Sequence, residues 1–192
     1  MSRPDSAVLD FLLTRRSRPA KTLAPPVPDR AALLPLLTAA ARVPDHGKLE
    51  PWRFVVIEGA AMARLAALAQ ARAEALGLDA ERTAKGRSQF DQGHLAVAVV
   101  ASPKPSGTVP PVEQLLSAGA VALSLLNAAL AAGWGACWLS GWPSHDAGFR
   151  REGLGLAGHE TVAGLVHIGT ATAVPPDRPR PDVGALTTWM AE

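Results

Sequence analysis

The hydrophobic pattern divides the chain into predicted helices and strands. Apolar or alanine-rich runs with few breakers predict helices over residues 7–14, 30–42, 60–76 and 113–132. Short apolar runs predict strands over residues 53–58, 95–101, 135–139 and 161–169. The run at 95–101, Leu-Ala-Val-Ala-Val-Val-Ala, is apolar throughout, which is typical of a buried central strand. Because helices and strands mix without strict βαβ alternation, the pattern favours an α+β fold.

Capping residues and polar stretches refine these boundaries. Asp29 is a suitable N-cap for the second helix, and Ser144 can cap a further short helix that ends at Arg151. Arg64 and Arg72 are expected to be solvated on the alanine-rich helix. Residues 77–93 are polar and irregular, and we expect them to form a mobile excursion.

The length and the last segment bear on domain organisation. A chain of 192 residues is long enough for one domain with a sizeable core, so residues 1–192 are expected to form a single domain. Proline and arginine dominate the tail from residue 170 until Leu186-Thr187-Thr188-Trp189-Met190. An apolar patch at the end of an extended tail is expected to dock, either on its own body or on a partner.

Charge and cysteine content argue against several classes of function. The 19 basic and 17 acidic residues give a formal net charge of +2, and the basic residues form no stripe with interleaved aromatic residues. A nucleic-acid partner is therefore not expected. Cys137 is the single cysteine, which excludes an intrachain disulfide and fits a reducing compartment, with the cytoplasm as the default. The most apolar segment, residues 118–132, has the length of a core helix, so no membrane span is expected.

Two arginine-rich segments carry groups suited to an anion. Arg15-Arg16-Ser17 offers two guanidinium groups and a hydroxyl, and a guanidinium can donate two parallel hydrogen bonds to a phosphate. The alternative is a solvated basic helix end that complements the helix dipole. In the tail, Arg178 and Arg180 could close over a phosphate or simply keep the tail soluble.

A polar loop at residues 44–54 leads directly into a predicted strand. Pro44 and Pro51 bracket it, and His46 and Lys48 supply a titratable ring and a cation. A rigid polar loop of this kind is expected to meet a ligand or another subunit. The alternative is a surface turn with a hydrogen-bonded histidine.

Trp138-Leu139-Ser140-Gly141 ends a predicted strand in a turn. Its backbone donors are free to approach a planar ligand, and Gly141 permits close approach, although an ordinary strand boundary has the same pattern. Cys137 has no basic neighbour in the sequence and is expected to be a small core residue. No histidine pair has the spacing of a metal-binding helix, so no metal site is expected.

Taken in order along the chain, these segments resemble the nitroreductase family of flavin proteins, and in particular its compact YdjA-like subgroup. The resemblance spans nearly the whole chain. It rests on Arg15-Arg16-Ser17, on Arg42-Val43-Pro44-Asp45-His46 leading into Pro51-Trp52-Arg53-Phe54, on Glu113-Gln114 before Ser117-Ala118-Gly119-Ala120, on residues 135–141 and on Val166-His167-Ile168-Gly169-Thr170. The chain differs from the family at Lys48 and Glu50, where the family often has Asn and Gln.

The resemblance implies a fold and a set of site residues. In this family a central, mostly antiparallel sheet is wrapped by helices, and FMN binds in a cleft at the interface of an intertwined homodimer. The tail, about 170–192, would then cross onto the partner subunit. By the resemblance, the cofactor contacts are Arg15, Arg16 and Ser17 at the phosphate and ribityl chain, Arg42 and His46 from the other subunit, Trp138, Leu139 and Ser140 at the strand end, and in addition Lys48 and Arg180.

The resemblance also implies a reaction. FMN takes hydride from NADH or NADPH and passes it to a nitroaromatic, a quinone or a similar small-molecule acceptor in a ping-pong cycle. No side chain is assigned a catalytic role beyond placing the cofactor. Two alternatives stay open: an FMN-binding dimer that stores or senses the cofactor with little turnover, and a basic domain without flavin that binds an acidic partner.

Overall fold

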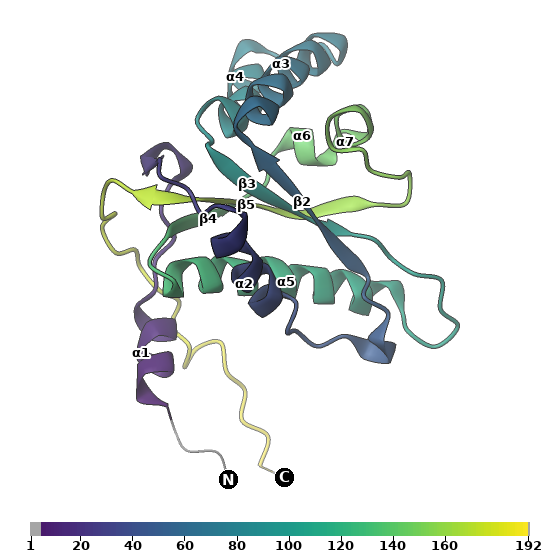
Figure 1. Ribbon diagram of the computed structural model, residues 1–192. Coiled ribbons are helices and arrows are strands. Elements are labelled where there is room, and N and C mark those ends of the chain that lie inside the picture. Colours follow the sequence, from purple (N-terminus) through teal and green to yellow (C-terminus); the bar gives the residue numbers. More distant parts are fainter. Residues whose placement is uncertain (1–4, 192) are drawn as a thin grey trace.

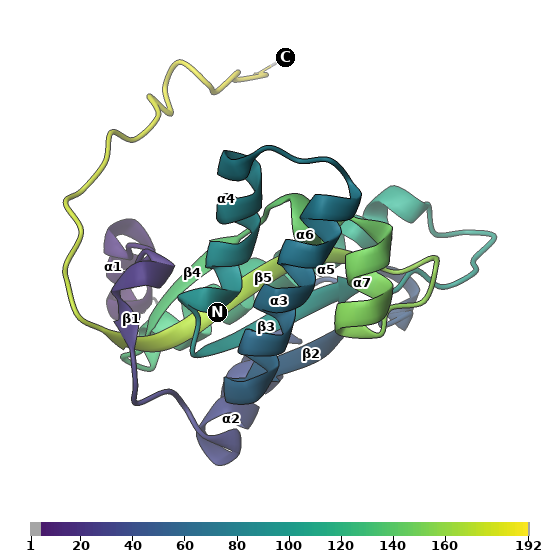
Figure 2. The ribbon, with the colours of Figure 1, turned by 90° about the horizontal axis from the view of Figure 1, so that it is seen from above.

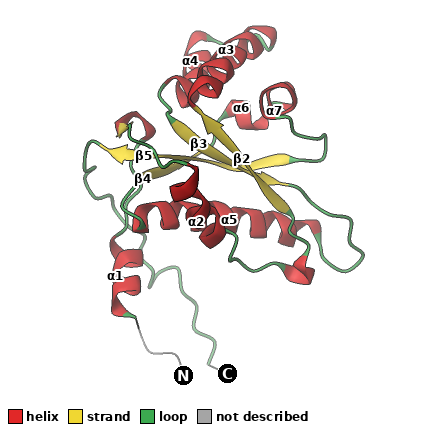
Figure 3. Ribbon diagram, in the orientation of Figure 1, coloured by secondary structure: helices red, strands yellow, loops and turns green. Residues whose placement is uncertain are grey.

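The protein is built around a five-stranded sheet that helices cover on both faces (Figure 1; Figure 3). The computed structural model describes residues 5–191, so residues 1–4 and 192 of the predicted domain lie outside the described residues. The strands are β1 (Leu23–Ala24), β2 (Trp52–Glu58), β3 (Leu95–Ala101), β4 (Gly135–Leu139) and β5 (Thr161–Ala171). The helices are α1 (Ser6–Thr14), α2 (Arg30–Ala40), α3 (Gly59–Ala75), α4 (Ala80–Asp91), α5 (Pro111–Ala131), α6 (Trp142–His145) and α7 (Ala147–Leu154), with short 3₁₀ turns η1 (Ala20–Thr22) and η2 (His46–Lys48).

Every strand pairing within residues 5–191 is antiparallel, which confirms the predicted α+β class. The long strand β5 pairs with β3, β4 and β1, and β2 pairs with β3 at the edge of the sheet. The register places His167 of β5 opposite Ala96 of β3 and Cys137 of β4. β5 therefore connects β4, whose end carries Trp138, Leu139 and Ser140, with the central strand β3.

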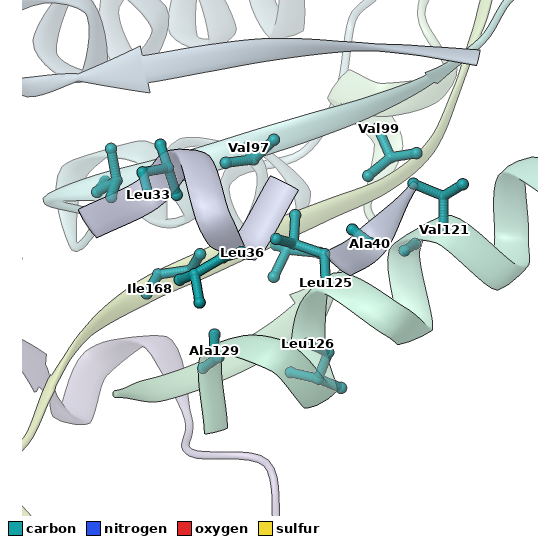
Figure 4. Packing of buried hydrophobic residues seen from close by; sticks show 14 residues of the cluster. Leu33, Leu36, Ala40, Val97, Val99, Val121, Leu125, Leu126, Ala129 and Ile168 are labelled. Atoms are coloured by element: carbon teal, nitrogen blue, oxygen red, sulfur yellow. The ribbon is translucent and has the colours of Figure 1, made fainter. Parts of the chain in front are cut away.

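The sheet has a hydrophobic core on each face, and successive side chains of β3 point alternately into one and the other. Val97 and Val99 point toward α2 and α5, where they pack with Leu125 and Ile168 (Figure 4). The intervening alanines of β3 face the opposite side and pack with residues of α3, α4 and α7. Both faces of β3 are thus buried, and the strand has the boundaries predicted from its continuous apolar run.

The helix after Asp29 also begins as predicted, because Asp29 Oδ1 accepts a hydrogen bond from the Ala32 N–H at 2.8 Å. The expectation of an irregular stretch over residues 77–93 is wrong, because most of these residues form α4. Asp79 caps this helix by accepting from the Arg82 N–H at 2.7 Å. Ion pairs one turn apart, Glu81–Lys85 and Arg87–Asp91, stabilise its exposed face.

Two further expectations near α7 are wrong. Asp146, and not Ser144, caps that helix, since its Oδ1 accepts from the Phe149 N–H at 2.7 Å. Arg72 is not solvated but donates two hydrogen bonds to the Asp146 carboxylate, at 2.8 and 3.1 Å. The guanidinium in turn lowers the pKa of Asp146. One carboxylate thus both starts α7 and joins it to α3.

Apolar side chains are exposed on α1, on α5 and in the tail. On α5 they are Val112, Leu115, Leu116 and Leu123, and on α1 they are Val8, Leu9, Leu12 and Leu13. The sequence predicts a core helix over residues 118–132, but only one face of α5 packs on the sheet. After β5 the tail leaves the body beside α1 and extends away from it, with Trp189 and Met190 almost fully exposed (Figure 2).

The same helix, α5, is long and apolar enough to cross a membrane by length and composition, the only such helix in the described part of the chain. Core helices pass the same test, and 44% of its most apolar window is buried inside the molecule.

Candidate functional site

A cluster of arginines follows the C-terminal end of α1. Arg15 caps this helix by donating its backbone N–H to Phe11 O at 2.7 Å, and the Arg18 N–H donates to Ala136 O of β4 at 2.8 Å. These bonds fix the short segment that carries Arg15, Arg16 and Arg18 against the sheet. Together with Gly133 and Trp134, the three arginines line a hollow of about 300 Å³.

The guanidinium groups of this cluster have too few acceptors among the described residues for all of their N–H groups. Arg15 donates to Ser17 Oγ at 3.2 Å and Arg16 to the Pro176 carbonyl at 3.3 Å. Within residues 5–191, however, Arg15 Nε, Arg16 Nε and Arg18 Nη1 are buried without a hydrogen-bond partner. Burial, and then the charges of Arg180 and Arg16, lower the pKa of Arg15. Crowded cations with unpaired donors are the pattern of an anion site.

The tail contributes to this cluster through Arg180. Its guanidinium donates to Asp177 Oδ1 at 3.0 Å, and the Arg178 N–H donates to the same oxygen at 2.8 Å. The backbone bond from Arg178 and the guanidinium of Arg180 lower the pKa of Asp177. Two segments about 160 residues apart in the sequence therefore meet here, with Arg16 touching the Pro176 carbonyl. Of the two tail arginines, Arg180 is the one whose charge acts on Arg15.

The end of β4 forms a second hollow with α4, of about 380 Å³. Leu139, Ser140 and Gly141 line it together with Gln89, while the Trp138 side chain is 37% exposed. Gln89 is buried, and its Oε1 has no partner among the described residues. A Cβ at residue 141 would overlap Gln89 Nε2, so the Gln89 amide would have to shift to admit any residue other than glycine. Ser140 Oγ lies 3.1 Å from His145 Nε2, which orients the hydroxyl.

The loop between α2 and β2 is held by its own polar groups. Asp45 accepts from the Leu49 N–H at 3.1 Å and from the Glu50 N–H at 2.9 Å. Lys48 and Glu50 adopt positive φ angles of 52° and 47°, which is rare for residues other than glycine. Such a backbone persists only where surrounding contacts hold it, and it clusters at ligand sites. Lys48 and Glu50, where the resembling family often has Asn and Gln, are therefore also the positions at which the loop backbone has positive φ angles.

This loop also contacts the start of α5. His46 Nδ1 lies 2.6 Å from Glu113 Oε2. Trp52 Nε1 donates to Ser117 Oγ at 3.1 Å, and that hydroxyl donates to the Pro44 carbonyl at 2.7 Å. The lining of the adjacent hollow, of about 340 Å³, includes Pro44, His46, Glu113 and Ser117.

The predicted site residues fall into two half-sites within one chain. Arg15, Arg16, Ser17 and Arg180 lie near the end of α5, where Leu130 lines the same hollow, and Trp138–Ser140 belong to the neighbouring strand. Arg42, His46 and Lys48 lie in the segment between α2 and β2, where His46 contacts Glu113 in the first turn of α5. At 1.5 Å per residue, the 17 residues from Glu113 to Leu130 span about 25 Å.

The structure adds Arg18, Gln89 and Glu113 to the candidate residues. Gln89 was missed because its segment was read as irregular, although Asp79 and the ion pairs spaced by four residues are visible in the sequence. No sequence signal distinguishes Arg18 from a surface arginine. Glu113 was part of the family resemblance. Its contact with His46 could not be predicted from the sequence, because the two positions are 67 residues apart.

Two other candidate chemistries can be judged from the structure. Cys137 is 5% exposed, and burial raises the pKa of its thiol to about 11, so the thiolate required of a nucleophile is disfavoured. This agrees with its expected role as a core residue. Across residues 5–191, no group of three or more His, Cys, Asp or Glu side chains is arranged to hold a metal ion.

Comparison with known proteins defines the family. The nitroreductase family pattern matches residues 12–170. YdjA of Escherichia coli (strain K12), provisionally named an NAD(P)H nitroreductase, is 35% identical over 162 residues, which cover 84% of this chain and 87% of that protein. The chain belongs to the nitroreductase family.

Solved structures agree on the fold. A nitroreductase-like family protein from Bacillus cereus superimposes with a TM-score of 0.81 at 22% identity and covers 100% of both chains. A mutant of the FMN- and NADPH-dependent nitroreductase NfnB from Sphigopyxis sp. strain HMH superimposes with a TM-score of 0.70 at 20% identity, covering 96% of this chain and 99% of that one.

Proposed function

We propose that this protein is an FMN-dependent NAD(P)H oxidoreductase that reduces small oxidants such as nitroaromatic compounds and quinones. The observation that carries the proposal is the arginine cluster after α1, whose buried guanidinium nitrogens have no acceptors among residues 5–191. A phosphate supplies such acceptors, and the FMN- and NADPH-dependent nitroreductase NfnB, which shares this fold, suggests that the phosphate belongs to FMN.

The side chains present fit FMN. Arg15, Arg16 and Ser17 would hold the phosphate, with Arg180 closing from the tail and Arg18 adding a further donor. When bound, FMN supplies the redox chemistry, since it accepts hydride from NADH or NADPH and returns it to an oxidant.

Around the ring system, the backbone of Trp138, Leu139 and Ser140 offers hydrogen-bond partners at the end of β4. Gln89 offers an amide whose Oε1 is unpaired in the described structure. Burial disfavours the Cys137 thiolate, and the described residues form no metal-binding cluster, so the side chains are proposed to contribute placement and electrostatics.

We also propose that the site is completed by a homodimer. The two half-sites lie about 25 Å apart along α5, so Arg42, His46 and Lys48 of one subunit would reach the cofactor held by the arginine cluster of the other. The exposed apolar faces of α1 and α5 would form the interface. The hollow of about 530 Å³ between these helices and α2 offers further apolar surface to the partner.

The extended tail would cross onto the partner in this assembly, with Leu186, Trp189 and Met190 covered there. Residues 1–192 would form one domain with this tail as its exchanged arm. The single buried cysteine and the nicotinamide donor fit a cytoplasmic location.

The first test is the visible absorption spectrum of the purified protein, followed by release and identification of any chromophore. Flavin bands and released FMN would support the proposal. A colourless protein that also fails to take up added FMN would contradict it and favour a domain without flavin. Bound FMN that NADH and NADPH both fail to bleach would favour the storage or sensing alternative.

A further inference from the structure

The pair formed by His46 and Glu113 has a geometry that the proposed cofactor contacts do not explain. His46 Nδ1 and Glu113 Oε2 are 2.6 Å apart, which is short for a nitrogen–oxygen hydrogen bond and typical of a charge-assisted one. An ionised carboxylate only accepts, so Nδ1–H is the donor. The bond therefore leaves Nε2 as the imidazole nitrogen available to other groups.

Neighbouring contacts fix both partners of this pair. Asp45 holds the turn that carries His46, through its bonds to the Leu49 and Glu50 N–H groups. Glu113 lies in the first turn of α5, and Ser117, one turn later, bonds to the Pro44 carbonyl. The loop and the helix are thus joined at two points, and the imidazole lies on the wall of the hollow that Leu116 and Ala120 also line.

The proposed reaction needs an acid at the acceptor. Reduction of a quinone to a hydroquinone takes up two electrons and two protons, and hydride supplies both electrons but only one proton. The second proton must come from water or from a side chain. This inference rests on the proposed function, in which His46 of one subunit reaches the cofactor of the other.

We propose that His46 donates this second proton and that Glu113 is the positioning residue that holds its ring for the transfer. The Nε2–H bond of the imidazolium breaks as an O–H bond forms on the acceptor oxygen. The ring is left neutral with Nδ1–H still bonded to Glu113. Water then returns a proton to Nε2, because 62% of the His46 side chain is exposed in the single chain.

Few other charges surround the imidazole. Among the residues that line the hollow, His46 and Glu113 are the titratable ones. On its own segment, Asp45 precedes it and Lys48 follows two residues later. The Asp45 carboxylate is committed to two backbone N–H groups. Glu113 is therefore the carboxylate bonded to the ring.

The orientation of the ring is tested by ¹⁵N NMR of the labelled flavoprotein. His46 resonances are assigned by their loss in His46→Gln. We expect the neutral ring of the wild type to carry its proton on Nδ1, and we expect Glu113→Gln to shift the population toward the Nε2-protonated form. Unchanged nitrogen shifts in Glu113→Gln would overturn the positioning role, and this readout requires no turnover.

The proton transfer is tested by separating the two half-reactions in a stopped-flow instrument. With quinone as oxidant, reoxidation should be at least ~10-fold slower in His46→Gln, since general acids contribute about 10²–10⁴-fold. Glu113→Gln should slow reoxidation by no more than His46→Gln does.

Glu74→Gln is the control, because it removes an exposed carboxylate on α3, away from this loop, and should leave reoxidation unchanged. Each variant is first bleached fully with the nicotinamide that reduces the wild type, and reoxidation is then measured by itself, which separates the two proposals. Failure of both NADH and NADPH to bleach the wild type would overturn the proposed function. Normal bleaching with equal reoxidation rates in the wild type and His46→Gln would overturn only the proton transfer.

Discussion

Buried N–H groups need acceptors, and one buried guanidinium nitrogen in each of Arg15, Arg16 and Arg18 lacks an acceptor in the described chain. The charge of Arg180 adds to this crowding and lowers the pKa of Arg15. An anion removes both problems, because it accepts the unpaired N–H groups and compensates the charge. At the scale of single residues, this is the strongest reason to place a phosphate here.

Replacement of Arg16 by alanine should therefore weaken FMN binding. Loss of a hydrogen bond between charged groups costs ~1.5–3 kcal/mol, which corresponds to a dissociation constant about 10- to 100-fold higher. Titration of the apoprotein into FMN, followed by flavin fluorescence, measures it. Arg87→Ala is the control, since Arg87 pairs with Asp91 on the exposed face of α4. Unchanged affinity in a folded Arg16→Ala protein would contradict the assignment.

His167 makes a second residue-scale prediction, about acid stability. It is 1% exposed, neither ring nitrogen has a partner in residues 5–191, and burial lowers its pKa from 6.5 to about 4. Between these two values the unfolded chain binds the proton and the folded chain does not. Stability should therefore fall as the pH drops from about 6.5 toward 4, by at most ~3 kcal/mol.

Urea midpoints measured from pH 7 to pH 4.5 check this expectation. The variant His167→Leu removes the titrating group and should flatten that part of the profile. Arg53 lowers the pKa of Glu160 to about 2. The stability that the ionised Glu160 contributes is therefore lost at pH values below this range. Parallel profiles for the wild type and His167→Leu would show that His167 does not titrate in this way.

At the scale of elements, the sequence predicts best where one local property decides. The strand β3 is apolar at every position, and Asp29 precedes a helix it can cap, so both were predicted correctly. The helix α4 was missed because its polar composition hides a buried face containing Gln89 and Phe90. The start of α7 was misplaced because Asp146 is favoured there by Arg72, which is 74 residues away in the sequence.

The two roles of Asp146 can be separated by comparing helix caps. Asp146→Ala removes the cap of α7 and leaves Arg72 without its partner, so we expect a loss of ~3 kcal/mol in unfolding free energy. Asp79→Ala removes only the cap of α4 and should cost ~1 kcal/mol. Chemical denaturation measures both, and equal losses would show that the ion pair to α3 adds nothing.

At the scale of the whole molecule, the predicted site residues do not meet within one chain. The arginine cluster and the loop with His46 lie near opposite ends of α5, and the apolar residues left exposed follow the same helix. The types and the order of the site residues along the sequence indicated the nitroreductase family, whose pattern matches residues 12–170. The convergence of Arg15, Arg16 and Arg180 could not be predicted from spacing, because only folding brings the tail back to α1.

A charge placed on the exposed face of α5 should therefore disrupt both assembly and cofactor binding. Leu123 is 44% exposed near the middle of this helix, and Leu123→Lys should produce monomers that lose FMN. Leu76→Lys is the matched control, since Leu76 is 47% exposed at the end of α3, on the other side of the sheet. Light scattering with size-exclusion chromatography reports the mass. A Leu123→Lys monomer that binds FMN as tightly as the wild type would contradict the shared site.

The central claim is that this protein turns over as a flavin-dependent NAD(P)H oxidoreductase. The most direct measurement is anaerobic mixing of the flavin-loaded protein with NADH or NADPH, then with a quinone, while the flavin absorption is followed. The account predicts that the nicotinamide bleaches the flavin bands and that the quinone restores them. Flavin that stays oxidised with both nicotinamides would contradict it.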